Sequence, residues 1–263
     1  MKWIWGEDIE WLYPLDAYLT LRITQAIFQP INLRFAEIGT WKGGWIRQLL
    51  LNNQSITGIA VDPFPGLPEI REYFLKNMES NGLQERVHLL NRLEDLEGYK
   101  FNLFHLDACH QQNDVNQELE FASKHLEDKG VICVDDIWHN LYPGVAVAVF
   151  TFLYKSDFAA FALTRNKIYL CHKDDYSTYF NFTKEIAEEM KIGYSLGVKI
   201  GDKTGEYVHT YSTSNAIHGF PVVNFTRYSN SEIARILAIS QPLSRSTRLR
   251  KKLVRIIKSC IKF

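Results

Sequence analysis

The sequence predicts an α/β fold, built as a doubly wound and mostly parallel sheet with helices on both faces. Three observations predict it. Short β-type runs alternate with amphipathic segments of helix length from about residue 33 to residue 172. Glycine or proline marks the ends of several of these helical segments. The last two β-type runs are separated only by Arg165 and Asn166, which is the spacing of an antiparallel hairpin.

The predicted elements follow one another in the order of a parallel α/β sheet. Five strands are expected at 33–38, 56–62, 87–91, 101–107 and 130–136. Helices are expected between and after them, at 43–52, 68–82, 113–130 and 144–155. The closing hairpin is expected at 157–164 and 167–173. Because helical crossovers connect successive strands, these should run parallel, and a terminal antiparallel hairpin should complete a mixed sheet.

The chain divides into three predicted regions. Residues 1–32 have the pattern of a helical cap rich in Trp, Tyr and Leu, which we expect to cover one edge of the sheet. Residues 33–175 contain the sheet itself. Residues 176–263 form a C-terminal extension, in which a substrate lobe precedes a basic tail.

Composition and charge exclude several classes of protein. Thirty basic residues balance thirty acidic ones, so no global charge favours a nucleic-acid partner. The four cysteines are widely spaced without a CxxC pair, which favours reduced thiols over disulfides or a zinc site. The chain begins without the pattern of a signal peptide and has no apolar run long enough to span a bilayer. We expect a cytoplasmic protein.

The turn after the first strand, EIGTWKG (37–43), has features of a nucleoside site. In open α/β sheets, ligands bind beyond the carboxyl ends of the strands. Gly39 and Gly43 allow a sharp turn and a close approach of the backbone to a ligand. Asp62 ends the second strand, 23 positions after Gly39, where a carboxylate can accept hydrogen bonds from both hydroxyls of a ribose. The alternative is a glycine-containing turn that binds nothing.

This ExGxxxG turn differs from the GxGxxG fingerprint of dinucleotide-binding proteins, and its acid disfavours a phosphate. It resembles the nucleoside-binding turn of the class I S-adenosylmethionine-dependent methyltransferases, which have a Rossmann-like sheet. The resemblance implies that the acid and glycines of the turn face the methionine part of the cofactor and that Asp62 holds its ribose. Glu94 follows the third strand, where the family often places a residue beside adenine, and a solvated loop charge is the alternative. The predicted cofactor residues are Glu37, Gly39, Thr40, Gly43, Asp62, Glu94 and Asp107.

Two neighbouring strands of the predicted sheet end in acids. Asp107 follows the fourth strand, and Asp135 and Asp136 follow the fifth. Because the carboxyl ends of adjacent parallel strands lie at the same edge, the three carboxylates should converge. Like charges at close range require a cation or shifted pKa values. Oxygen ligands suit Mg²⁺, which can lower the pKa of a substrate hydroxyl.

The residues around these acids carry a closer resemblance. DxxH at Asp107, KGVICVDD at the fifth strand and the following PGVAVAVFTF are similar to the macrocin-type O-methyltransferases. The catechol-type metal-dependent O-methyltransferases share the aspartate and the later acidic pair. The resemblance implies Mg²⁺ on Asp107, Asp135 and Asp136, and it puts His110 where catechol-type enzymes carry a lysine general base. His139, on a loop at the same edge, is a further candidate for proton transfer. The alternatives are a helix cap for Asp107 and solvated roles for the histidines.

The C-terminal segment RSTRLRKKLVRIIKSCIKF (245–263) is strongly basic. It holds eight Lys or Arg residues, interleaved with aliphatic residues at helical spacing, and no acid. Such a segment can lie on an anionic membrane as an amphipathic helix. The alternative is a terminal helix docked on its own domain. The pattern leaves both open.

These observations predict an S-adenosylmethionine-dependent O-methyltransferase acting on a hydroxyl of a sugar or another small molecule, with or without help from Mg²⁺. One alternative is a non-catalytic module that binds the cofactor or serves as a membrane-associated scaffold. Another is an NAD-dependent oxidoreductase, against which Glu37 and the missing GxGxxG argue. The identity of the acceptor and the oligomeric state stay open.

Overall fold

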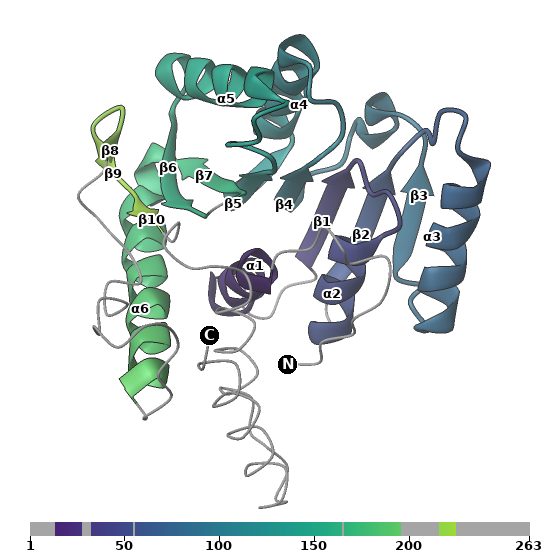
Figure 1. Cartoon of the computed structure of the whole chain (residues 1–263), viewed down its shortest axis with the longest axis horizontal. Coiled ribbons are helices and arrows are strands. Elements are labelled where there is room, and N and C mark those ends of the chain that lie inside the picture. Colours follow the sequence, from purple (N-terminus) through teal and green to yellow (C-terminus); the bar gives the residue numbers. More distant parts are fainter. Residues whose placement is uncertain (1–13, 28–32, 55, 165, 196–215, 225–263) are drawn as a thin grey trace, which may run out of the picture.

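The structure is organised around one sheet (Figure 1). The computed structural model describes residues 14–27, 33–54, 56–164, 166–195 and 216–224. The first five strands are β1 (Leu33–Ile38), β2 (Ile56–Val61), β3 (Val87–Leu90), β4 (Phe101–Leu106) and β5 (Leu126–Val134). They are followed by β6 (Phe158–Leu163), β7 (Ile168–His172), β8 (Ala216–Ile217), β9 (Phe220–Pro221) and β10 (Val223–Asn224).

The strand order confirms the predicted fold class. Among the described residues, the sheet has the order β10-β6-β7-β5-β4-β1-β2-β3. Strands β1 to β5 pair in parallel, whereas β7 is antiparallel to both of its neighbours, β5 and β6. The predicted hairpin is therefore present as β6 and β7. A small additional hairpin, β8 and β9, leads into β10, which extends the sheet beside β6.

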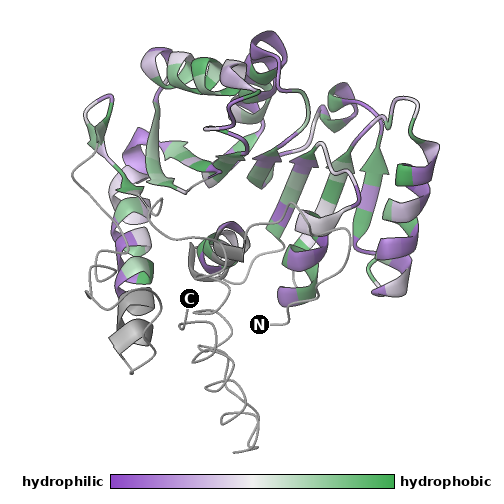
Figure 2. Cartoon of the chain, viewed as in Figure 1, coloured by the Kyte–Doolittle hydropathy of each residue, from purple (hydrophilic) through white to green (hydrophobic). Residues whose placement is uncertain are grey.

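Helices cover both faces of the sheet, as predicted. They are α1 (Pro14–Ile27), α2 (Gly44–Asn52), α3 (Pro68–Ser80), α4 (Gln112–Lys124), α5 (Pro143–Lys155) and α6 (Tyr176–Ser195), with the short 3₁₀ helices η2 (Leu93–Leu96) and η3 (Lys173–Asp175). α4 and α5 bury their apolar sides on one face, and α1, α2, α3 and α6 bury theirs on the other. Figure 2 shows the hydrophobic strands enclosed between more polar outer helical surfaces. Burial of these two apolar layers supplies the main driving force for the fold.

One predicted boundary differs from the structure. A helix was expected over 113–130, but α4 ends at Lys124, and β5 begins at Leu126, whose side chain is buried and which pairs with Phe101. The register then shifts before Val131 pairs with Leu103. The polar segment between Leu126 and Val131 carries no helical apolar stripe, so pairing with β4 prevails over helix propensity.

The flanking regions are described only in part. α1 falls within the predicted cap, and it lies on a face of the sheet between α2 and α6 rather than at an edge. Most of the predicted substrate lobe and the whole basic tail, 245–263, lie outside the described residues. None of the described helices is both long and apolar enough to cross a membrane.

Gly39 joins the first turn to the end of β4. Its φ is +81°, and a Cβ at this position would lie 2.1 Å from the carbonyl oxygen of Asp107 and 2.5 Å from Cα of Ala108. The neighbouring backbone is fixed on both sides, because Asp107 N–H donates to Ile38 and Gly39 N–H donates to Val61. No side chain fits here, so Gly39 contacts the HLDACH segment (105–110), which ends β4 and begins the next loop, through backbone alone.

We expect Gly39→Ala to lower the free energy of unfolding by more than Gly98→Ala. Gly98 has a similar φ of +84°, but its Cβ would meet nothing within 4 Å. Both substitutions carry the strain of positive φ, about 1–2 kcal/mol, and only Gly39→Ala adds steric overlap, worth about 1–3 kcal/mol more. Urea denaturation of the two variants measures the difference. Equal losses of stability would contradict the steric role of Gly39.

Candidate functional site

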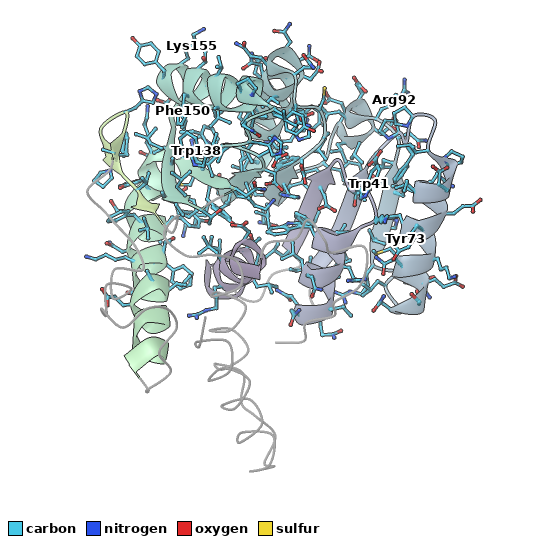
Figure 3. All side chains as sticks on the ribbon, in the orientation of Figure 1. Trp41, Tyr73, Arg92, Trp138, Phe150 and Lys155 are labelled. Atoms are coloured by element: carbon cyan, nitrogen blue, oxygen red, sulfur yellow. The ribbon has the colours of Figure 1, made fainter. Side chains whose placement is uncertain are left out.

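Asp62 organises the loops that follow β1 and β2. Its two carboxylate oxygens accept hydrogen bonds from the backbone N–H of Trp41 (3.0 Å) and of Phe64 (2.8 Å). Both of these residues have positive φ, 48° and 46°, which is uncommon for large side chains and is often found at binding sites. Trp41 is exposed beside the turn (Figure 3). The carboxylate of Asp62 is partly exposed and retains lone pairs for further donors.

Glu37 lies beneath the same turn and is buried, with 2% of its surface exposed. Its Oε2 accepts a hydrogen bond from the Thr40 hydroxyl at 2.6 Å, and its Oε1 lies 3.0 Å from His105 Nδ1. The predicted cofactor residues Glu37 and Thr40 therefore bind each other. A ligand in the turn would meet the backbone of 39–43 before it met the carboxylate of Glu37.

A buried polar network continues from His105 to the end of β5. His105 Nε2 lies 2.7 Å from the ammonium of Lys167, and this ammonium also donates to Asp135 Oδ2. Asp135 Oδ1 accepts from the side-chain amide of Asn166 and from the backbone N–H of Asp136. The ring of Trp45 stacks on His105 with 4.6 Å between centroids, and Lys167 Nζ lies 4.5 Å from the centre of the Trp45 ring.

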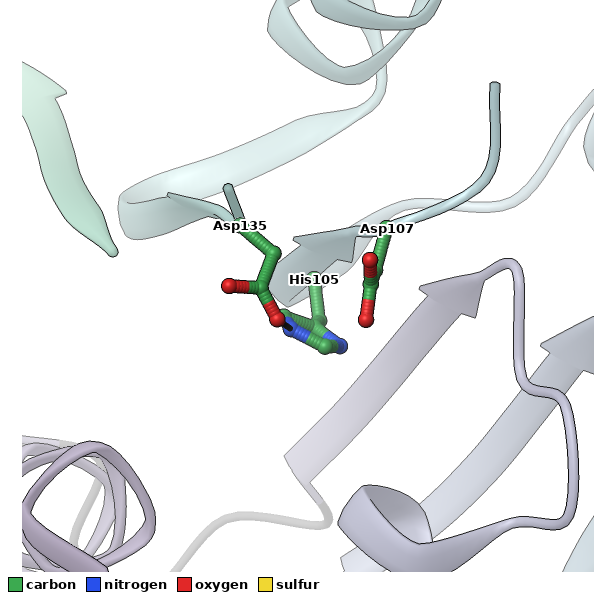
Figure 4. Close-up of side chains that lie close together, drawn as sticks. All are labelled: His105, Asp107 and Asp135. Carbon is green, nitrogen blue, oxygen red and sulfur yellow. Dashed lines mark ion pairs between the residues drawn. The ribbon is translucent and has the colours of Figure 1, made fainter. Parts of the chain in front are cut away.

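Strand register explains why these side chains meet. Glu37 pairs with His105 across β1 and β4, so the two side chains share one face of the sheet. Val134 pairs with Ile168 across the antiparallel β5 and β7. Asp135 and Lys167 are the next residues on each side, which brings them opposite each other at the carboxyl edge. Figure 4 shows His105, Asp107 and Asp135 converging from β4 and β5.

The charges of the network determine its protonation. Burial raises the pKa of Asp135, but the Lys167 ammonium and the His105 ring together outweigh burial and hold that pKa well below its usual range. Burial lowers the pKa of Lys167, but Asp135 and the other ionisable groups around it together outweigh burial and raise the net pKa. Burial and Lys167 lower the pKa of His105, whereas hydrogen bonds to Asp135 and Glu37 raise it, and the net direction is upward. The 2.7 Å contact nevertheless requires an unprotonated His105 Nε2 while Lys167 is charged, because an ammonium has only protons to offer.

The predicted catalytic residues form a second, more exposed group. His110 Nε2 lies 3.1 Å from Asp136 Oδ2 and 3.8 Å from Asp107 Oδ1. Tyr142 stacks on His110, with 4.0 Å between ring centroids, and on His139, with 4.4 Å. The structure thus brings together Asp107, His110 and Asp136 and positions His139 through Tyr142.

Protonation separates the roles of Asp107 and His110. The adjacent carboxylates of Asp107 and Asp136 raise the pKa of His110 to about 9, so at neutral pH the imidazole carries a proton. Burial first, and repulsion by Asp135 second, raise the pKa of Asp107 to about 6. Its side chain is still 33% exposed. A carboxylate that titrates near neutral pH and reaches solvent is the better proton acceptor of the two.

The predicted magnesium ligands are divided between the two groups. Among the described residues, possible ligand atoms gather as His105, Asp107 and Asp135, and as Asp107, His110 and Asp136, and neither group contains all three aspartates. Asp135 turns inward, where Lys167 and Asn166 already bind both of its oxygens. Mg²⁺ prefers oxygen ligands, and each group includes a histidine nitrogen. The residues present therefore do not fit the predicted three-aspartate magnesium site.

The remaining predicted cofactor residues lie along the same edge. Gly43 has a φ of +77°, and a Cβ there would meet Met78 and Phe74 of α3 at 2.7 Å, so this glycine permits close helix packing. Glu94 is exposed in η2. Arg92 precedes it, and its backbone N–H donates to Asp95, which fixes this turn at the end of β3 (Figure 3).

Sequence reasoning missed His105, Lys167, Asn166 and Trp45. His105 stands two residues before Asp107. Because side chains alternate between the two faces along a strand, this spacing of two indicates that both side chains share a face. Lys167 begins an apolar run and was assigned only to a strand. Its position opposite Asp135 depends on the register of β5 and β7, which no local pattern specifies.

We expect Asp135→Asn to lower the free energy of unfolding by about 3–5 kcal/mol, because it leaves the buried Lys167 without a counter-ion. Asp136→Asn is the matched control, with the same chemical change one residue away on a more exposed side chain. It should lower the free energy of unfolding by about 1 kcal/mol or less. Chemical denaturation near neutral pH measures both values. Similar losses in the two variants would show that Lys167 and Asp135 are not strongly coupled.

Glu118 of α4 predicts a pH dependence of stability. It is buried beneath the HLDACH segment, where it accepts a hydrogen bond from the backbone N–H of Cys109, and burial raises its pKa to about 8. The folded state therefore binds a proton more tightly than the unfolded state, so this group's contribution to stability falls as pH rises from about 4.5 towards about 8. We expect Glu118→Gln to lose less stability between about pH 5 and about pH 8 than the unchanged protein does.

The exposed Glu120→Gln on the same helix is the control for this measurement. It should keep the full pH dependence of the unchanged protein, because its side chain lies in solvent in the folded state as it does in the unfolded state. Urea denaturation across the pH range compares the three proteins. Parallel curves for all three would show that Glu118 is not the titrating group.

Comparisons with known proteins give a match to one family model. Residues 36–137 match the model of a family described as a methyltransferase domain. This range includes Glu37, Asp62, Asp107 and Asp136, and it ends before Lys167. No protein with a curated description matches the chain.

Solved structures show the same fold. The chain is similar to a putative O-methyltransferase from Klebsiella pneumoniae, with 18% identity, a TM-score of 0.51, and coverage of 64% of this chain and 83% of that one. It is also similar to cofactor-bound Rv0187 from MTB, with 16% identity, a TM-score of 0.50, and coverage of 60% of this chain and 79% of that one. Residues 36–137 thus match the methyltransferase-domain model, and the two solved structures share the fold of the chain.

Proposed function

We propose that this chain is an S-adenosylmethionine-dependent methyltransferase that acts on a hydroxyl of a sugar or another small molecule. One observation carries the proposal. Gly39 of the first turn lies in direct backbone contact with Asp107 and Ala108, so the nucleoside turn and the candidate acceptor acids form one continuous edge. A methyl donor bound over the turn would lie beside a group able to take a proton.

The residues of the first two loops fit the cofactor. Gly39 and Gly43 keep the turn free of side chains, and the carboxylate of Asp62 is partly exposed between two fixed N–H donors. Asp62 would accept hydrogen bonds from the ribose hydroxyls, as the acid at the end of a second strand does in such sheets. Glu37 would hold Thr40 and His105 in place beneath the turn. The assignment of residues 36–137 to a methyltransferase domain supports this role.

S-adenosylmethionine, when bound, supplies an electrophilic methyl group that an acceptor oxygen attacks in line. Asp107 would take the proton of the acceptor hydroxyl, since its pKa of about 6 lies near neutral pH. His110, protonated, would hold the carboxylates of Asp107 and Asp136 together through its Nε2–H. Alignment of the two reactants is the larger contribution, since it can supply several kcal/mol of the barrier reduction.

We expect the chain to bind S-adenosylhomocysteine with saturation in isothermal titration calorimetry, and Asp62→Ala to weaken that binding by about 10- to 100-fold. The reason is the loss of charge-assisted hydrogen bonds, each worth about 1.5–3 kcal/mol. Asp157→Ala is the matched control, because this side chain is 93% exposed at the start of β6. It should bind like the unchanged protein.

Two results would contradict the proposal. Unchanged affinity in Asp62→Ala would remove the assigned ribose contact. Binding of NADH in preference to S-adenosylhomocysteine would favour the oxidoreductase alternative. Cofactor binding without methyl transfer to any hydroxyl acceptor would instead favour a non-catalytic module.

A further inference from the structure

Lys167 occupies an unusual position for a lysine. Its side chain is 2% exposed. The ammonium contacts Asp135 Oδ2, His105 Nε2 and the face of Trp45. Lysine is almost never fully buried unless it is paired. Lys167 finds the partners that its burial requires at the carboxyl edge of the sheet.

The backbone fixes this position on both sides. Thr164 N–H donates to Lys167 O at 2.8 Å and closes the β6–β7 turn, and Ile137 N–H donates to Asn166 O at 3.0 Å and ties that turn to the end of β5. Asp135 N–H donates to Leu106 O at 2.9 Å. Lysine and aspartate are thus held opposite each other by main-chain bonds, not by the rotamer of one long side chain.

The ammonium stands where a metal ion on Asp135 would have to bind. Asp135 Oδ2 is bound by Lys167, and Oδ1 is bound by Asn166 Nδ2 and by Asp136 N–H at 2.8 Å. A divalent cation on either oxygen would lie beside this buried positive charge. Repulsion between like charges is strong where water is excluded.

We propose that Lys167 is the fixed cation of this site: it takes the place of the divalent metal at Asp135 and positions Asp135 and His105 without one. This proposal rests on the proposed function only where it calls the carboxyl edge of the sheet a methyltransferase site. The contacts of Lys167 do not depend on that function. Lys167 is a positioning residue here. It connects the acid under the nucleoside turn, through His105, to the acid at the end of β5.

The test measures metal binding directly, with Mg²⁺ and Mn²⁺ as the probes. Calorimetric titration of the unchanged full-length protein should detect no stoichiometric binding that depends on Asp135. Lys167→Met removes the charge and keeps the apolar stem, so it should create a site at which Mn²⁺ raises the melting temperature. Lys167→Arg keeps the charge and should resemble the unchanged protein. The double variant Lys167→Met, Asp135→Asn should lose the new Mn²⁺ response.

Two results would overturn the proposal. The first is that the unchanged protein binds Mg²⁺ or Mn²⁺ stoichiometrically and that Asp135→Asn abolishes this binding. This measurement can be made even if Lys167→Met fails to fold. The other is a folded Lys167→Met that shows no greater response to Mn²⁺ than Lys167→Arg does. Titration of the unchanged protein with S-adenosylhomocysteine separates the two ideas, because absence of cofactor binding there would count against the proposed function and leave the metal result standing.

Discussion

The ion pair between Lys167 and Asp135 is the interaction on which the arrangement of the candidate site depends. Removal of two charges from water is strongly unfavourable unless each finds close partners, and here His105, Asn166 and the Trp45 ring complete the set. The pair therefore specifies one geometry for the carboxyl edge of the sheet. Asp135 cannot turn outward to join Asp136 without leaving a buried ammonium unpaired. The division of the three aspartates into an inner and an outer group follows from that constraint.

The outer group of side chains differs from the buried inner network in exposure and in protonation. Asp107, His110 and Asp136 are partly exposed, and His110 Nε2 lies 3.1 Å from Asp136 Oδ2 and 3.8 Å from Asp107 Oδ1. The charges of the inner network are buried and paired, whereas in the outer group the pKa of Asp107 is raised to about 6 and that of His110 to about 9. A rigid buried layer supporting a titratable outer layer is the arrangement expected of a site that aligns one reactant and moves a proton from another.

Local patterns were enough to predict the sheet, its hairpin and the edge at which the acids lie. Alternation of strands and helices fixes the parallel order, and the turn at Gly39 and the acid at Asp62 follow from it. The inner network was not predictable in the same way, because Glu37 meets His105, and Asp135 meets Lys167, only through strand register. The helix expected over 113–130 was too long for a related reason, since pairing of Leu126 with Phe101 is a long-range contact. Strand register thus decides which aspartates can share a cation. The number of acids at the strand ends does not.

The β6–β7 turn has a consequence for how this site can vary among related chains. Loops at the edge of a sheet usually tolerate insertions and deletions, because they carry few packing constraints. This turn is different, since it places Asn166 and Lys167 beside Asp135, at the start of an antiparallel strand. Adding or removing a single residue there would exchange the faces of the side chains that follow and withdraw the buried positive charge. The length of the β6–β7 turn, more than the identity of the acids, would then decide whether such a site must bind a metal ion from solution.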